Sequence, residues 1–133
     1  MATDLSDLIS DLRNLADRCA CASVNDSPDS VRQLQSYVKH IPSPDRFGVS
    51  VIASRDNFEA RLELGCALDA CMLLLGPNVG YMMSCNGAGL NFATIVLLEN
   101  GAEHSCSASS GALALTGAMA IALSQCLEEQ SRV

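Results

Sequence analysis

The chain has 133 residues, of which 49% are apolar and 17% are charged. This composition supplies enough apolar surface for one domain with a hydrophobic core, and it excludes a disordered chain. The 15 acidic and 8 basic residues give a formal net charge of −7. No basic stripe offsets this charge, so a nucleic-acid polymer is not an expected partner.

The N-terminal stretch MATDLSDLISDLRNLADR is acidic and amphipathic. It has neither the basic beginning nor the continuous apolar segment of a secretory signal peptide. Apolar runs elsewhere are shorter than the roughly 18–20 residues that cross a bilayer. We therefore expect a soluble, cytoplasmic protein with no membrane contact. Its seven cysteines are expected to be reduced thiols that pack as small apolar side chains.

The first 40 residues are predicted to form a helical part of the domain. Residues 4–21 form an amphipathic helix, because apolar residues recur at i, i+3, i+4 and i+7 along one face. Pro28 begins a second, shorter helix that extends to about Val38. The two prolines in residues 40–48 end this helical part.

The next segment predicts a β-hairpin followed by a short helix. Residues 47–54 are rich in β-branched side chains, and residues 57–64 alternate between apolar and charged ones, which is typical of a strand with one wet face. Residues 55–57 supply the turn. Residues 66–76 then predict a helix that ends at Gly76-Pro77 and has one apolar face, formed by Leu68, Cys71, Met72 and Leu75.

The rest of the chain predicts three more strands and a final helix. Residues 79–85 and 90–98 are strands joined by a turn, and Asn100-Gly101 turns the chain into a last strand, residues 104–108. The final helix extends to about Glu129. The expected order is α-α-β-β-α-β-β-β-α, an α+β single domain, 1–133, with an antiparallel sheet of about five strands in residues 47–128.

Two short segments indicate an internal β-β-α duplication. The sequence DNFEA at 56–60 resembles LNFAT at 90–94, and each is followed by apolar strand residues and later by a helix.

The serines before the final helix are the best candidates for a ligand site. A serine at this position caps the helix, and the first N–H groups of a helix also bind phosphate or carboxylate, so both interpretations remain open. Arginines in or beside the first hairpin would assist, because a guanidinium matches phosphate oxygens. The candidate ligand-binding residues are Ser107, Ser109, Ser110, Gly111, Arg46, Arg55 and Arg61. The expected ligand is a small nucleotide.

The final helix is apolar on nearly every side, so more than one side must be covered. One side can face the sheet, and the other can face the N-terminal helix or another copy of the chain. A ridge of small residues would allow close approach, and we expect a homo-oligomer. The candidate interface residues are Ala114, Ala118, Ala122 and Met119.

The residues that could bind metal or catalyse a reaction lie at unfavourable spacings. One residue separates the two potential ligands in Cys19-x-Cys21 and in His104-x-Cys106. Zinc ligands are usually separated by two to four residues. No nucleophile elbow, phosphate-binding loop or other catalytic signature occurs. We therefore expect no metal, no cofactor and no enzymatic activity.

Residues 67–98 and 108–123 together resemble the phage α-β-α sandwich domain family of small bacteriophage and prophage proteins. Ala67-Leu68-Asp69-Ala70 and Leu73 to Pro77 match the family's helix motif, and Ala112 to Leu115 with the alanines that follow match its last helix. The sequence departs from the family at Gly80-Tyr81, where a Trp is usual, and at Ser110-Gly111, where Thr-Pro is usual. The resemblance implies a phage origin and an α/β/α layered sheet, and it brings no known activity.

The leading hypothesis is a non-enzymatic, oligomeric phage protein that captures a small ligand in the bacterial host cytosol. By analogy with phage sponge proteins, this ligand would be a nucleotide signal of host immunity, so the role would be anti-defence. The alternative is an interaction module that binds a host or phage protein through the apolar helix or a sheet edge. A third hypothesis is a redox- or metal-dependent protein that uses the cysteines.

Overall fold

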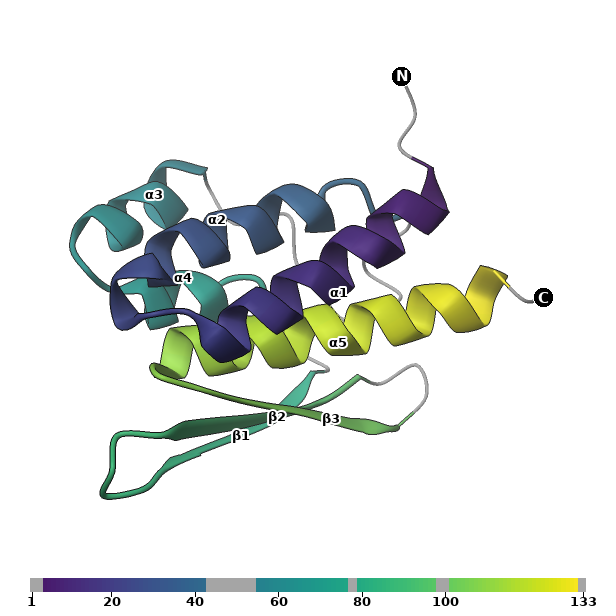
Figure 1. The fold of residues 1–133 in the computed structure, drawn as a ribbon. Helices are drawn as coiled ribbons and strands as arrows, with labels where there is room; N and C mark the ends of the chain where they lie inside the picture. The colour runs from purple at the N-terminus through teal and green to yellow at the C-terminus, as the bar shows by residue number, and fades with distance from the viewer. Residues whose placement is uncertain (1–3, 43–54, 77–78, 98–100, 132–133) are drawn as a thin grey trace.

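Helix α5 (Gly111–Ser131) lies between the sheet on one side and the other helices on the opposite side (Figure 1). The structure is a computed structural model that describes residues 4–42, 55–76, 79–97 and 101–131. These residues form five α-helices and one antiparallel sheet with the strand order β1-β2-β3. The α+β class predicted from the sequence is therefore confirmed.

Helices α1 (Leu5–Cys21) and α2 (Ser27–Val38) confirm the two predicted N-terminal helices. The Asp4 carboxylate caps α1 by accepting a hydrogen bond from the Ser6 N–H at 3.1 Å. A short 3-10 helix, Val24–Asp26, leads into α2, whose first turn contains a proline. The predicted apolar face of α1 is the face that is buried; it consists of Leu8, Ile9, Leu12, Leu15, Ala16 and Cys19.

Strands β1 (Gly80–Cys85), β2 (Asn91–Val96) and β3 (Glu103–Ala108) confirm the three strands predicted for the second half of the chain. The β1–β2 turn is closed by Asn86, whose side-chain oxygen accepts from two backbone N–H groups at 2.9 and 3.1 Å. Gly89 completes the turn with a φ of 83°. The register places Ala93 between Met83 on β1 and Cys106 on β3, and this row faces α5.

Helix α5 confirms the predicted final helix, and it is the core of the fold. Its buried residues occur on every side, as expected for a helix that other elements surround. By length and composition it could also cross a membrane. However, 78% of its most apolar segment is buried among the other elements, and a core helix meets the same two criteria.

The strand predicted for residues 57–64 is wrong, because residues 57–63 belong to helix α3 (Arg55–Glu63) and Leu64 lies in the turn that follows. Phe58 and Leu62 are buried one helical turn apart, whereas Leu64 is 78% exposed. Residues 55–57 accordingly begin a helix and do not form a hairpin turn. The other strand predicted for this hairpin, residues 47–54, lies outside the described residues.

Four further predictions need correction. The β-β-α duplication is lost because residues 56–60 of its first unit lie in helix α3. The sheet has three strands within the described residues, where about five were predicted. Helix α4 (Ala67–Met72) ends four residues before Gly76. Among the described elements, helices pack on one face of the sheet only, so the α/β/α layering implied by the family resemblance is not observed in this part of the chain.

Candidate functional site

A cleft of about 390 Å³ opens at the first turn of α5. Its other walls come from the 3-10 helix, from the start of α2 and from the start of α4, so segments far apart in the sequence meet there. The lining is mainly apolar and contains no charged side chain among the described residues. It consists of Val24, Asn25, Ser27, Pro28, Gly65, Ala67, Leu68, Ser110, Gly111 and Ala112.

Two serines hold the polar end of this cleft together. The Ser110 hydroxyl oxygen accepts a hydrogen bond from the Leu113 N–H at 3.1 Å, so Ser110 caps α5 as predicted. Ser27 donates its hydroxyl proton to the Val24 carbonyl at 2.7 Å. A hydroxyl has one proton, and that of Ser27 is already donated to Val24. In the 2.9 Å hydrogen bond between the two hydroxyls, Ser110 is therefore the donor and Ser27 the acceptor. These bonds tie the starts of α2 and α5 to each other.

The backbone at the start of α5 supplies the donors of the cleft. Gly111 and Ala112 occupy the first turn, where helical N–H groups have no intrahelical acceptor. The dipole of the helix adds a partial positive charge at the same end. Gly111 also lets neighbouring side chains approach closely, because a Cβ at this position would lie 3.1 Å from the Met83 Cε.

The structure brings Ser110 and Gly111 to the cleft and places Ser107, Ser109 and Arg61 elsewhere. The Ser109 hydroxyl donates to the Ala22 carbonyl at 2.8 Å. Ser107 lines a separate shallow depression on the outer face of the sheet. Arg61 donates to the Asn57 side chain on α3 at 3.2 Å and does not line the cleft. Arg55 begins the same helix. Arg46 lies outside the described residues.

Several lining residues were not predicted from the sequence. Val24 and Pro28 belong to a segment that the sequence marks only as a loop and a helix start, and Leu68 was assigned to an apolar helix face. No pattern in the sequence identifies them. In the structure Leu68 and Val24 are 36% and 55% exposed. This exposure follows from tertiary packing, which residue spacing does not encode.

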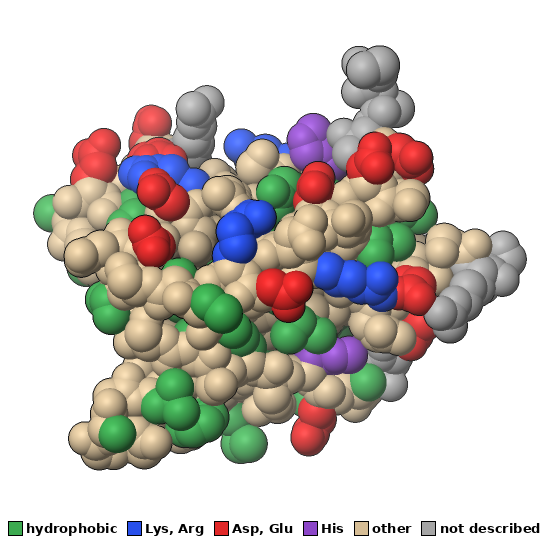
Figure 2. All heavy atoms as spheres, viewed as in Figure 1, with side chains coloured by type: hydrophobic (Ala, Val, Ile, Leu, Met, Phe, Trp, Pro, Cys, Tyr) green, Lys and Arg blue, Asp and Glu red, His purple; other side chains and the backbone are tan. Residues whose placement is uncertain are grey.

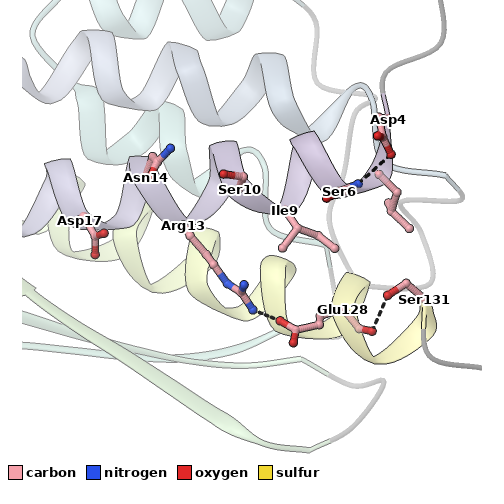
Figure 3. A pocket seen from close by; sticks show the side chains of 10 residues that line it. Asp4, Ser6, Ile9, Ser10, Arg13, Asn14, Asp17, Glu128 and Ser131 are labelled. Carbon is pink, nitrogen blue, oxygen red and sulfur yellow. Dashed lines mark hydrogen bonds and ion pairs between the residues drawn. The ribbon is translucent and has the colours of Figure 1, made fainter.

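A second, larger groove of about 730 Å³ lies between the first half of α1 and the end of α5 (Figure 3). An ion pair between Arg13 and Glu128 bridges the two helices there. The Ser131 hydroxyl donates to the Glu128 carbonyl at 2.8 Å. The other charged residues on the lining, Asp4 and Asp17, are acidic. The groove contains none of the residues predicted for a site.

The ridge of small residues on α5 is covered by the chain itself. Ala114, Ala118, Ala122 and Met119 are all fully buried, and α1, β2 and β3 pack around the helix. The sequence assigned this cover to another copy of the chain or to the N-terminal helix. In the structure these four residues are not available to a second copy.

The buried thiols are arranged as packing groups. Burial raises the pKa of Cys71 to about 12, although a hydrogen bond with Thr116 partly opposes this effect. Burial likewise raises the pKa of Cys19 to about 11 and shifts the pKa of Cys106 upward. Such thiols stay protonated at neutral pH and are poor nucleophiles. Within the described ranges, no group of three or more His, Cys, Asp or Glu residues is placed to bind a metal ion.

The cleft at α5 thus contains two residues predicted as ligand-binding, Ser110 and Gly111, together with lining residues that were not predicted. It combines backbone donors, two hydroxyl groups and an apolar wall, and it contains no acid–base pair in its described lining. In comparisons with protein-family models, curated proteins and solved structures, this chain matches none.

Proposed function

We propose that the chain is a non-enzymatic binding protein that holds a small amphipathic anion of the nucleotide type in the cleft at α5. One observation carries the proposal: the first turn of a 21-residue helix opens into an uncharged, mainly apolar cleft. Helix N-termini bind phosphate and carboxylate groups through their N–H groups and dipole. The apolar wall suits the planar part of such a ligand.

The size and charge of the cleft support a small ligand. Its volume of about 390 Å³ lies at the lower end of the range found for small-molecule sites. Although the chain has a net charge of −7, no carboxylate among the described lining residues would repel an anion at close range. The local field therefore favours an anion more than the net charge suggests.

The biological role that we propose follows from this chemistry and from the family resemblance. A phage protein that binds a nucleotide signal of bacterial immunity in the host cytosol would lower the free concentration of that signal. Binding alone is sufficient for this role, so it requires neither a catalytic residue nor a cofactor.

Isothermal titration with cyclic nucleotides and with ADP-ribose tests the proposal. Leu68→Glu would place a carboxylate in the wall of the cleft and is expected to abolish the binding heat. Leu64→Glu is the matched control, because Leu64 is 78% exposed and does not line the cleft; this variant should bind like the unmodified protein. The proposal fails if no compound gives heat, or if both variants bind equally well.

The alternative function is an interaction module that binds a protein through the apolar helix or a sheet edge, and of these two surfaces the described residues leave only the sheet edge accessible. The apolar helix cannot serve, because α5 is mostly buried within the fold. Among the described elements, no strand pairs with the β1 edge of the sheet.

A further inference from the structure

Strand β1 is an edge strand that leaves most of its length uncovered. It pairs with β2 on one side, and no other described element pairs with it. Five of its six residues are exposed, and only Met83 is half-buried. Native proteins usually protect such an edge with a charged residue, a proline or a bulge. The sequence of β1, GYMMSC, contains no charged residue and no proline, and its register with β2 is regular.

The backbone groups that face the open edge can be identified from the turn. Asn86 donates its N–H to the Leu90 carbonyl at 3.0 Å, so this pair is hydrogen-bonded. Bonded and non-bonded pairs alternate along an antiparallel ladder. The N–H and C=O groups of Tyr81, Met83 and Cys85 therefore point away from β2, toward the open edge.

We propose that β1 pairs with β1 of a second copy of this chain, antiparallel and about a two-fold axis at Met83. The pairing joins two three-stranded sheets into one of six strands. Met83 bonds to Met83 of the second copy, and Tyr81 bonds to Cys85. A two-fold contact requires a surface that is complementary to itself, and the outward-facing groups of β1 meet this requirement. The inference does not depend on ligand binding at the cleft.

Charge favours a second copy at β1. The chain has 15 acidic and 8 basic residues, yet residues 80–97 contain no charged residue. Two acidic molecules can therefore meet at this hairpin without opposing like charges. Figure 2 shows the same division on one face, with hydrophobic side chains at the end of the hairpin and most charged ones over the helices. The other edge strand, β3, carries Glu103 and packs against α1.

Apolar side chains beside β1 would be covered by this pairing. Tyr81 is 48% exposed although it lies in the row of the sheet that faces the helices. Met83 and Leu68 both lie against Gly111. A Cβ added to this glycine would lie 3.1 Å from the Met83 Cε and 3.6 Å from the Leu68 Cδ2. In the dimer, Tyr81 of the second copy lies beside Cys85 on this same side of the sheet. The contact is small compared with a standard interface, so we expect a dissociation constant of about 1–100 µM.

Light scattering and native mass spectrometry over a concentration series test the proposal. The unmodified protein is expected to be a dimer at about 100 µM and a monomer on dilution. Met83→Pro removes an N–H that faces the edge and leaves the β1–β2 ladder intact, because this N–H does not bond to β2. We expect it to weaken the dimer by at least about thirtyfold.

Two further variants keep the test decisive. Tyr81→Lys places an inward-pointing charge on the edge strand and should also give a monomer, so it decides the outcome if Met83→Pro does not fold, as judged by circular dichroism. Ser105→Pro makes the equivalent change on β3 and should remain a dimer. The proposal is overturned if the unmodified protein stays monomeric at about 100 µM, if the β1 variants still dimerise, or if only the β3 variant dissociates.

Discussion

Gly117 and Cys106 approach each other so closely that the glycine of α5 has no room for a side chain. A Cβ on Gly117 would lie 2.5 Å from the Cys106 Sγ and 3.2 Å from its Cβ. The Cβ of Cys19 on α1 would lie 3.4 Å away. The glycine is therefore the point at which α1 and β3 both reach the central helix. Close packing of three elements at one position makes the fold sensitive to added volume there.

Gly117→Ala is expected to destabilise the protein, although alanine is the better helix former. The higher helix propensity would contribute about 1 kcal/mol, whereas overpacking typically costs about 1–3 kcal/mol. We therefore expect a net loss of about 1 kcal/mol in the free energy of unfolding, measured in urea. The same substitution in a Cys106→Ala background should cost less, because the thiol has been removed. Equal costs in both backgrounds would contradict the steric explanation.

The same position shows what the sequence could and could not predict about α5. Its apolar composition correctly predicted that more than one side is covered. Composition does not say whether the covering surface belongs to this chain or to another copy, because an alanine ridge packs equally well in both cases. Helix α1 covers α5 because Cys19 packs against Gly117. This contact is set by the tertiary arrangement and not by local sequence.

The error at residues 57–64 has a different physical origin. Phe58 and Leu62 are four residues apart, and this spacing puts them on one side of a strand and also on one side of a helix. Periodicity alone therefore could not separate the two structures. Propensity could have done so, because this segment contains Ala, Leu, Glu and Arg and no β-branched residue.

A pair of alanine substitutions distinguishes the helix from the strand at this segment. Leu62 is buried in α3 and Leu64, in the turn just after it, is 78% exposed, whereas in a strand both would lie on the same face. Leu62→Ala should destabilise the protein by about 2–4 kcal/mol because it leaves a cavity. Leu64→Ala should change the stability by less than about 0.5 kcal/mol. Similar losses for the two variants in urea unfolding would favour the strand.

Ser110→Ala tests how much the N-cap of α5, which lies in the cleft, contributes to stability. The substitution removes the bond to Leu113 and the contact with Ser27. We expect the free energy of unfolding to fall by about 1 kcal/mol, the usual value of an N-cap. Ser107→Ala is the control, because this serine is exposed on the sheet and is not part of the cap; it should leave the stability unchanged within about 0.5 kcal/mol.

The cleft itself could be predicted only in part. A serine before an apolar helix indicates a cap, and this cap is present at Ser110. The apolar wall formed by Val24, Pro28 and Leu68 arises because three separate segments end at the same place. The arginines were predicted to assist because they lie in or beside a predicted hairpin. Helix α3 takes the place of the second strand of that hairpin. Arg61 accordingly donates to Asn57 on the same helix.

The buried thiols predict that stability falls at high pH. Burial raises the pKa of Cys71 from 9.0 to about 12, and that of Cys19 to about 11. The folded protein therefore retains these protons at a pH where the unfolded chain loses them. The stabilisation is fully present below pH 9 and is lost as the pH rises toward 11–12. Each thiol lowers the free energy of unfolding by up to about 1.4 kcal/mol per pH unit in this range.

Urea unfolding between pH 7 and pH 10.5, roughly the range over which unfolded thiols ionise, measures this effect. Cys71→Ala lowers the overall stability, but it should also make the decline above pH 9 shallower, because one protected thiol is missing. Cys66→Ala removes an exposed thiol and should retain the slope of the unmodified protein. If the slope is the same in all three proteins, the titration of Cys71 does not contribute. The slope separates this role from simple packing, because a lost packing contact changes stability equally at every pH.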